Sequence, residues 1–222
     1  MSETMEVSNT DPLVRVRNLK VAFQIDKGTI FEAVKGVSFD IPRNRTVALV
    51  GESGSGKSVT SLAILGLLPP ENSIVDPASE ILYDGRNLAR LAPAALRELR
   101  GADISMIFQE PMTSLNPVLT IGAQISEALR LHRPLSRSAA LDRAIDLLRV
   151  VKIPAAEQRA REYPHQLSGG MRQRAMIAMA LACEPAVLIA DERCRAIYPP
   201  YEEKRPSHWT ACWHAEGVAP HV

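Results

Sequence analysis

The sequence has little of what marks membrane-spanning, secreted or nucleic-acid-binding proteins. Its 26 Lys and Arg balance 25 Asp and Glu, so no global positive charge would attract nucleic acid or an anionic bilayer. No apolar run reaches the roughly 18–20 residues that span a bilayer, and residues 1–12 are polar and acidic, unlike a signal peptide. The three cysteines form no Cys-x-x-Cys pair, which argues against a disulfide framework. We therefore expect a cytosolic chain that does not bind nucleic acid, with a disordered stretch at residues 1–12.

The composition that remains is that of a globular α/β protein. The chain has 222 residues, of which 46% are apolar and 23% charged, and this length can bury a sizeable core. Apolar residues alternate in residues 13–25 and 33–41, which predicts strands of an antiparallel β layer. Thr46 to Val50 is continuously apolar, which predicts a strand buried on both faces, and it runs into glycines and a helix from Lys57 to Leu68.

The second half of the sequence predicts parallel strands joined by helices. Buried strands are expected at Ile104 to Phe108 and at Val187 to Asp191, the latter after an Ala- and Met-rich helix from Gly170 to about Cys183. Two amphipathic helical patterns lie within residues 121–163 and are broken by prolines. We interpret the segment from about residue 112 to about residue 165 as a helical insert in the α/β core.

One motif indicates phosphate binding. Residues 51–58, GESGSGKS, fit the pattern GxxxxGK[ST] between a predicted strand and a predicted helix. The glycines allow the backbone to curl with its N–H groups inward, Lys57 supplies a charge for the β- and γ-phosphates, and the Ser58 hydroxyl can ligate Mg²⁺. The alternative is a glycine-rich turn with an exposed lysine.

Three further features are weaker when taken alone. Asp191 and Glu192 follow a buried strand, where Asp191 would hold Mg²⁺ and Glu192 would polarise an attacking water, unless both are simply solvated. Ser168 to Gly170 begin a helix and offer an anion site, unless they only cap it. Gln109 follows a predicted strand, and an isolated glutamine there is usually solvated.

Together, in this order, these elements resemble the nucleotide-binding subunit of ABC transporters. GESGSGKS resembles the Walker A motif of that family, Gln109 its Q-loop, LSGGMRQR its signature motif and VLIADE its Walker B motif. Residues 106–122 and 163–185 resemble the oligopeptide/dipeptide importer branch. The resemblance covers Val14 to Glu192 and implies an ABC ATPase domain over 13–192, with a P-loop NTPase (RecA-like) core, an N-terminal antiparallel β layer and the helical insert.

The resemblance implies a site shared between two subunits. One chain would bind MgATP through its P-loop, and the second would supply Ser168, Gly169 and Gly170 across a head-to-tail dimer. Gln109 would touch Mg²⁺ and the attacking water, and Glu192, Lys57 and Gln109 would be the catalytic residues. The P-loop ligands would be Gly51, Glu52, Ser53, Gly54, Ser55, Gly56, Lys57 and Ser58, and the metal ligands Ser58, Gln109 and Asp191. For adenine stacking, Phe23 is the candidate and Phe31 the competing one, and a core role is at least as probable for either.

The same resemblance implies the partners. The helical insert would dock two membrane permeases that work with an extracytoplasmic peptide-binding protein. The chain would then lie at the cytoplasmic face of the inner membrane and couple ATP hydrolysis to peptide import.

Residues 193–222 depart from the family pattern. Both tryptophans, three histidines and two cysteines lie there without helical or strand period, so we expect an irregular tail and a core that lacks its last α/β units. A frameshift or truncation is one explanation, and a metal site from Cys194, His208, Cys212 and His214 is another. The alternative function is accordingly a nucleotide-binding remnant with little hydrolysis.

Overall fold

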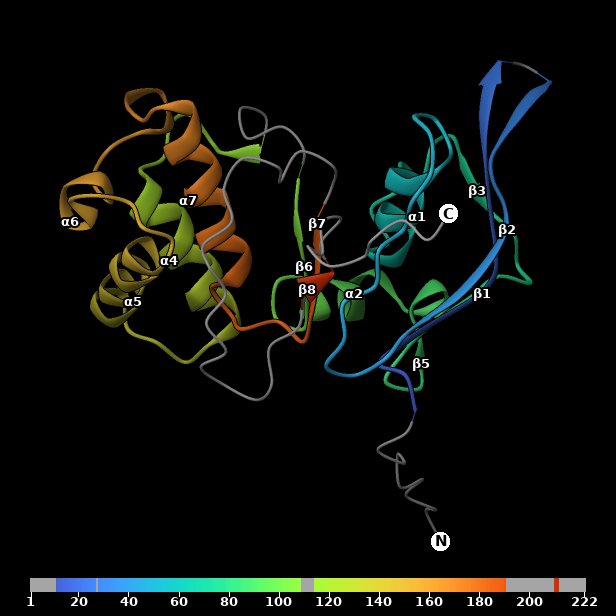
Figure 1. Cartoon of the computed structure of the whole chain (residues 1–222), viewed down its shortest axis with the longest axis horizontal. Helices are drawn as coiled ribbons and strands as arrows, with labels where there is room; N and C mark the ends of the chain where they lie inside the picture. Colours follow the sequence, from blue (N-terminus) through green and yellow to red (C-terminus); the bar gives the residue numbers. More distant parts are fainter. Residues whose placement is uncertain (1–10, 27, 109–113, 191–209, 212–222) are drawn as a thin grey trace, which may run out of the picture. The chain divides into compact units, whose positions relative to one another are not determined.

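The structure is a computed structural model that describes residues 11–26, 28–108, 114–190 and 210–211 (Figure 1). The chain divides into two compact units, residues 1–97 and 98–222. Residues 1–10, most of the stretch that we expected to be disordered, lie outside the described residues.

The first unit is built on a long antiparallel hairpin, as the alternating pattern predicted. Strands β1 (Val14–Asp26) and β2 (Thr29–Ile41) pair from Val14↔Ile41 to Asp26↔Thr29. On its other edge β1 pairs with β3 (Ser73–Val75) and β4 (Glu80–Tyr83), and β4 pairs with β5 (Arg86–Asn87). The sequence analysis did not assign these last three strands, because two to four residues are too few to show a two-residue period.

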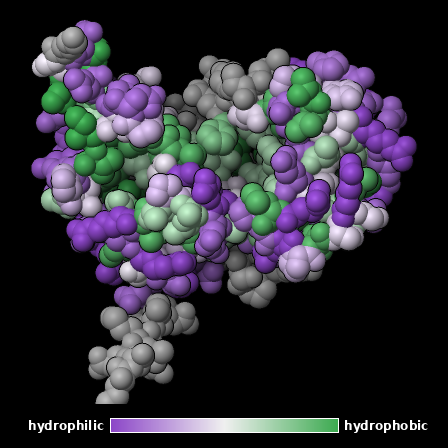
Figure 2. Space-filling view, turned by 180° about the vertical axis from the view of Figure 1, so that it is seen from behind, coloured by the Kyte–Doolittle hydropathy of each residue, from purple (hydrophilic) through white to green (hydrophobic). Residues whose placement is uncertain are grey.

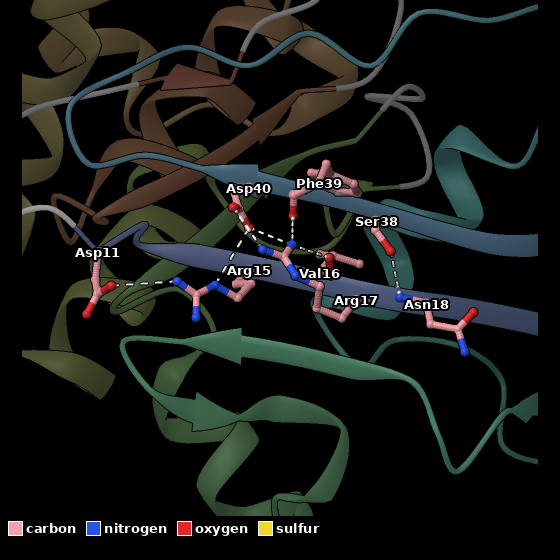
Figure 3. Close-up of polar contacts among 8 residues, drawn as sticks. All are labelled: Asp11, Arg15, Val16, Arg17, Asn18, Ser38, Phe39 and Asp40. Carbon is pink, nitrogen blue, oxygen red and sulfur yellow. Dashed lines mark hydrogen bonds and ion pairs between the residues drawn. The ribbon is translucent and has the colours of Figure 1, made fainter.

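A break in register explains how β1 keeps one apolar face. Val14 and Val16 are buried, and so are Leu19 and Val21, which lie out of phase with the first pair. The pairing with β2 shifts between Val16 and Leu19, where Asn18 has φ 46°. This β-bulge resets the alternation, so both pairs face the core. The N–H of Asn18 donates to Ser38 Oγ at 2.8 Å (Figure 3).

The hairpin also carries a cluster of ion pairs at its open end (Figure 3). Arg17 Nη1 lies 2.7 Å from Asp40 Oδ1 and Arg17 Nη2 donates to Asp40 Oδ2 at 2.9 Å, a bidentate pair. Arg17 Nη1 also donates to the carbonyl oxygens of Val16 and Phe39, which ties β1 to β2. The hydrogen bond from Arg17 lowers the pKa of Asp40, and Arg15 contributes to the same direction.

Helix α1 (Lys57–Ile64) packs in this unit against β1, β2 and the short 3₁₀ helix η1 (Leu88–Arg90). It ends earlier than the predicted Leu68 because Gly66 has φ 61°. The N–H of Gly66 donates to Ala63 O and that of Leu67 to Leu62 O, at 3.0 and 2.8 Å. These two bonds are the Schellman motif that terminates a helix at a left-handed glycine.

The predicted strand Thr46 to Val50 is wrong. The segment has no strand conformation, and Val50 is 92% exposed. A strand needs a hydrogen-bonded neighbour, and among the described residues none pairs with this segment. The continuous apolar run of this segment predicted a buried strand, and the described structure shows neither a strand nor a buried Val50 there.

The second unit contains a parallel sheet, as predicted. Strand β6 (Ile104–Ile107) pairs with β7 (Val187–Ala190) from Ile104↔Val187 to Ile107↔Ala190. Helix α2 (Pro93–Leu99), most of which belongs to the first unit, precedes β6 in the sequence. Every residue of both strands is buried, which explains the unbroken apolar runs.

Within the tail, a two-residue strand lies beside β7. Thr210 and Ala211 form β8, which pairs in parallel with Leu188 and Ile189 of β7. They are the residues of 193–222 that the structure describes. The edge of β7 presents unpaired N–H and C=O groups, and such an edge accepts an extended segment that has no strand period of its own.

The helical insert has the two predicted helices, α4 (Ile121–His132) and α5 (Arg137–Val150), separated at Pro134. After Pro154 follow α6 (Ala156–Arg159), the 3₁₀ helix η2 (Pro164–Gln166) and α7 (Gly169–Leu181). One face of α7 packs on the insert and another on the β6–β7 sheet, so α7 is apolar on two sides. The insert core includes Ile121, Ile125, Leu129, Ala140, Ala144, Leu148, Ala175 and Ala178.

We predict that the pair between Arg17 and Asp40 stabilises the fold at neutral pH and not in acid. A carboxyl whose pKa is lowered by folding stabilises the fold above its unfolded pKa of about 3.9, and this contribution is lost as the pH falls through the lowered value. Asp40→Asn should lower the melting temperature at pH 7, modestly because both side chains are half exposed. The difference from wild type should shrink as the pH falls through the lowered pKa of Asp40.

The control is the same substitution at Asp142, an exposed carboxylate on α5. A melting-temperature difference for Asp40→Asn that stays constant from neutral to acidic pH would contradict the assignment.

Candidate functional site

The glycine-rich loop has the backbone conformation that the motif predicts. Gly54 and Gly56 have φ 81° and 88°, in the left-handed region that favours glycine, and Gly56 is the N-cap of α1. A Cβ atom on Gly56 would lie 2.4 Å from the carbonyl oxygen of Ala33 in β2. Only glycine fits this contact, which fixes the start of α1 against the sheet.

Lys57 closes the loop from its far end. Its Nζ donates to the carbonyl oxygens of Gly51 and Glu52, each at 2.7 Å, and lies 3.4 Å from Ser55 Oγ. The ammonium group therefore lies across the beginning of the loop. Ser58, on the first turn of α1, is exposed, as are residues 51–55.

The loop and helix fit a phosphate group. The N-cap is a glycine, so no side-chain oxygen caps the first turn of α1, and no acidic residue lies in that turn. The N-terminal N–H groups and the positive end of the helix dipole attract an anion, and Lys57 adds a full charge.

The second group of candidate residues begins helix α7. Ser168 is its N-cap, and its Oγ accepts a hydrogen bond from the N–H of Met171 at 3.3 Å. Gly169 and Gly170 follow as the first helical residues, and all three are exposed. Capping by Ser168, one of our two interpretations, is thus present, and the exposed glycines leave the helix terminus accessible to an anion.

The remaining predicted residues, Gln109, Asp191 and Glu192, lie outside the described residues. The strands that precede them end at Ile107 and Ala190, which are register partners in the parallel pair. The structure therefore describes the scaffold of this part of the site and not its side chains. The P-loop and the start of α7 belong to different units, each described by itself.

The two candidate aromatic residues are register partners across the hairpin. Phe23 of β1 is half-buried, whereas Phe31 of β2 is 54% exposed. With Ile25 and Ile30, Phe31 adds to the exposed apolar side chains near the hairpin end, where Figure 2 shows hydrophobic surface among hydrophilic residues.

The sequence analysis missed two features of the hairpin face. One is the carbonyl of Ala33 against Gly56, for which a sequence carries no signal. The other is an open cavity of about 430 Å³ between β1, β2 and β3. Its lining includes Lys20, Lys35, Glu32 and Asp76, and Lys20 lies 3.7 Å from Asp76.

Comparison with known proteins identifies the family. The ABC transporter family matches residues 34–195, nearly three quarters of the chain. The chain belongs to the ABC transporter family. The GESGSGKS loop before α1 and the LSGGMRQR segment at the start of α7 both lie inside the matched range.

The relatives include ATP-binding proteins of peptide transport. The dipeptide transport ATP-binding protein DppD of Bacillus subtilis (strain 168) is 52% identical over 187 residues, which is 84% of this chain and 55% of DppD. The glutathione import ATP-binding protein GsiA of Escherichia coli (strain K12) is 49% identical over 201 residues, 88% of this chain and 32% of GsiA. The chain thus spans between about a third and about half of these relatives.

Solved structures confirm the ABC ATPase fold. The ATP-binding cassette MJ0796, in a dimeric post-hydrolysis state bound to ADP and Pi, superposes with a TM-score of 0.72 at 29% identity. The match covers 83% of this chain and 76% of that one. Within the described part of this ABC chain, no helix is long and apolar enough to cross a membrane.

We predict that Gly56→Ala disrupts the Walker A loop more than an equivalent change elsewhere. At a left-handed position, alanine costs roughly 1–2 kcal/mol from its Cβ alone, and at Gly56 the contact with Ala33 O adds to this. The control is Gly85→Ala, since Gly85 has φ 77° and nothing within 4 Å of a Cβ atom. Gly56→Ala should lower the melting temperature further than Gly85→Ala and weaken ATP binding, measured by thermal denaturation and titration calorimetry. Equal effects of the two variants would show that the contact with Ala33 does not constrain the loop.

Proposed function

We propose that this chain is the ATP-binding subunit of an importer that couples ATP hydrolysis to uptake of peptides, including dipeptides. The observation that carries the proposal is the Walker A geometry, with Gly54 and Gly56 in left-handed conformations and Lys57 across the loop. The names of the relatives support the substrate class, because DppD is a dipeptide transport protein and GsiA a glutathione import protein, and glutathione is a peptide.

MgATP is the nucleotide that these residues would hold. The loop N–H groups and Lys57 would bind the β- and γ-phosphates, while Ser58, Gln109 and Asp191 would serve the metal. Bound Mg²⁺ neutralises phosphate charge as the γ-phosphoryl group leaves. Glu192 would orient and polarise the attacking water, Gln109 would contact it, and Lys57 would stabilise the charge that develops on the phosphate.

A second copy or a related subunit completes the site in this proposal. The exposed Ser168, Gly169 and Gly170 at the start of α7 would approach the ATP bound by the P-loop of the partner. The dimeric MJ0796 structures support this arrangement, since that cassette forms dimers and was solved with ADP and Pi. Because each site needs two chains, hydrolysis would depend on dimer closure.

Two permease subunits would dock on the helical insert, at the cytoplasmic face of the inner membrane, with an extracytoplasmic peptide-binding protein delivering the substrate. The segment before α4 offers exposed apolar side chains for this contact, since Val118 is 74% and Leu119 37% exposed. Docking would transmit closure of the ATP-bound dimer to the permeases.

Lys57 tests nucleotide binding. Lys57→Ala removes a charge-assisted phosphate contact worth about 1.5–3 kcal/mol, so the affinity for MgATP should fall by roughly 10- to 150-fold. Lys152→Ala removes an exposed lysine from the insert and should leave the affinity unchanged. Titration calorimetry measures both variants, and equal ATP affinity of Lys57→Ala and wild type would contradict the assignment of the loop.

Asp191 and Glu192 test hydrolysis. In complexes with the cognate permease pair, Glu192→Gln should bind MgATP normally and lose turnover, because the amide cannot polarise water as a carboxylate does. Asp191→Asn should weaken the Mg²⁺-dependent part of ATP binding.

Phosphate release in the reconstituted complex measures turnover. Hydrolysis by Glu192→Gln at the wild-type rate would overturn its assigned role. ATP binding without permease-dependent turnover in the wild type would instead favour the alternative function, a nucleotide-binding chain with little hydrolysis.

A further inference from the structure

A buried glutamine holds the segment that precedes helix α4. Gln124 is 7% exposed, and its amide makes three hydrogen bonds to the loop of residues 116–119. Its Oε1 accepts from the N–H of Asn116 at 2.9 Å, and its Nε2 donates to the carbonyl oxygens of Asn116 and Leu119, each at 3.0 Å. A single side chain thus satisfies backbone groups at both ends of the loop.

This loop is fixed in shape and presents apolar side chains. Asn116 Oδ1 accepts from the N–H of Val118 at 3.1 Å, and Thr120 caps α4 by accepting from the N–H of Ala123 at 3.3 Å. Val118 and Leu119 point their exposed surface out of a backbone that Gln124 holds. A rigid exposed loop can bind a partner without first having to become ordered.

The first turn of α4 is also hydrogen-bonded to residues 160–162, in the segment that precedes the signature motif. The N–H of Ile121 donates to Glu162 O at 2.9 Å, and that of Gly122 to Ala160 O at 2.8 Å. A Cβ atom on Gly122 would lie 2.8 Å from Ala160 O and 3.1 Å from Ala160 Cβ. The helix and this segment touch backbone to backbone, and glycine is what permits it.

From there the chain reaches Ser168 through a short, well-bonded turn. Gln166 Oε1 accepts from the N–H of Tyr163 at 2.8 Å, within η2. Arg172, one turn into α7, donates from Nη1 to Leu167 O at 2.8 Å. The start of α7 and the segment that precedes it are therefore tied together.

We propose that the first turn of α4 is a rigid connection between the loop of residues 116–119 and the signature helix, with Gln124 and Gly122 as its positioning residues. Gln124 fixes the shape of the loop surface that contacts the permease. Gly122 keeps the position of that surface constant relative to Ser168. This inference rests on the proposed function, because it assigns the loop to a permease.

The consequence is a coupling between two binding events. If the loop and the signature helix move as one piece, the docked permease and MgATP each favour the same placement of α7. Binding of one then strengthens binding of the other by the same factor, which for coupled sites is about 5–150-fold.

The first experiment breaks the connection at the loop. The chain is titrated against nanodiscs that contain its cognate permease pair, without nucleotide, by biolayer interferometry. Gln124→Leu should weaken binding by roughly tenfold or more, because the carbonyl groups of Asn116 and Leu119 lose their donor and the loop is no longer held. Its affinity for MgATP in the absence of permease should stay unchanged.

Gln158→Leu is the matched control, since Gln158 is an exposed glutamine whose Nε2 donates to Glu162 Oε1. It should bind nanodiscs and MgATP as the wild type does. Gln124→Met, with an unbranched side chain of similar length, replaces Gln124→Leu if that variant does not melt cooperatively. Nanodisc binding by the Gln124 variant at wild-type affinity would overturn its role.

The second experiment breaks the connection at the signature. Gly122→Ala keeps the loop contacts of Gln124 and pushes the segment at Ala160 away, so nanodisc binding and MgATP binding measured separately should both persist. The factor by which MgATP tightens nanodisc binding should fall toward one. Gly122→Ala combined with Ala160→Gly, which removes the Cβ contact, should restore part of this factor and serves as the second variant if the single one fails to fold.

The outcomes separate this inference from the proposed function. Wild-type chain that does not bind permease nanodiscs would refute the proposed function and the inference with it. Nanodisc binding with no dependence on MgATP, or with full coupling in Gly122→Ala, would refute the inference alone.

Discussion

The contact between Gly56 and the carbonyl oxygen of Ala33 is the constraint on which the phosphate-binding loop depends. It brings the N-cap residue of α1 against the backbone of β2, at a distance that leaves no room for a Cβ atom. Strand β2 is paired with β1 along its whole length and is also held by the ion pairs of Arg17 with Asp40. The start of α1, which contacts β2, is therefore held in place by the sheet. A phosphate site needs this, since N–H groups stabilise an anion only when they already point at it.

In the second unit, the packing of helix α7 fixes the position of Ser168, as the contact with β2 fixes the start of α1 in the first unit. It contacts the parallel strands with Met176 and Ala180 and the insert with Ala175 and Ala178, so alanines on two faces allow close packing on both sides. The position of Ser168 is therefore determined by the sheet and the insert together. A displacement of the insert relative to the sheet would have to move this helix, because cores packed on both sides do not deform continuously.

Local chemistry explains which features could be predicted from the sequence. The alternation in β1 and β2, the apolar runs of β6 and β7, the prolines around α5 and the cap at Ser168 each leave a pattern over a few neighbouring residues. The ends of these elements were less accurate, since the end of α1 depends on the conformation of Gly66. The wrong prediction for Thr46 to Val50 shows where local patterns fail. A strand forms only when a neighbouring segment pairs with it, and the apolar run does not indicate whether such a neighbour is available.

Contacts of a helix with segments outside it left no such pattern. In the sequence, Gln124 looks like any polar residue on an amphipathic helix. Only the folded structure shows that its amide is hydrogen-bonded to backbone groups of residues 116–119. Gly122 reads as a poor helix former, yet the position requires glycine because the chain returns to it at Ala160.

In the proposed ATP site, each half would depend on a glycine that lets a second backbone segment approach, Gly56 in the first unit and Gly122 in the second. In each unit the contact fixes a helix start without any ligand, so in the proposed dimer the approach of the two chains would be the main motion that nucleotide binding drives. If the chain works with permeases as proposed, this stiffness would matter, because flexibility within either unit would absorb displacement before it reached the permeases.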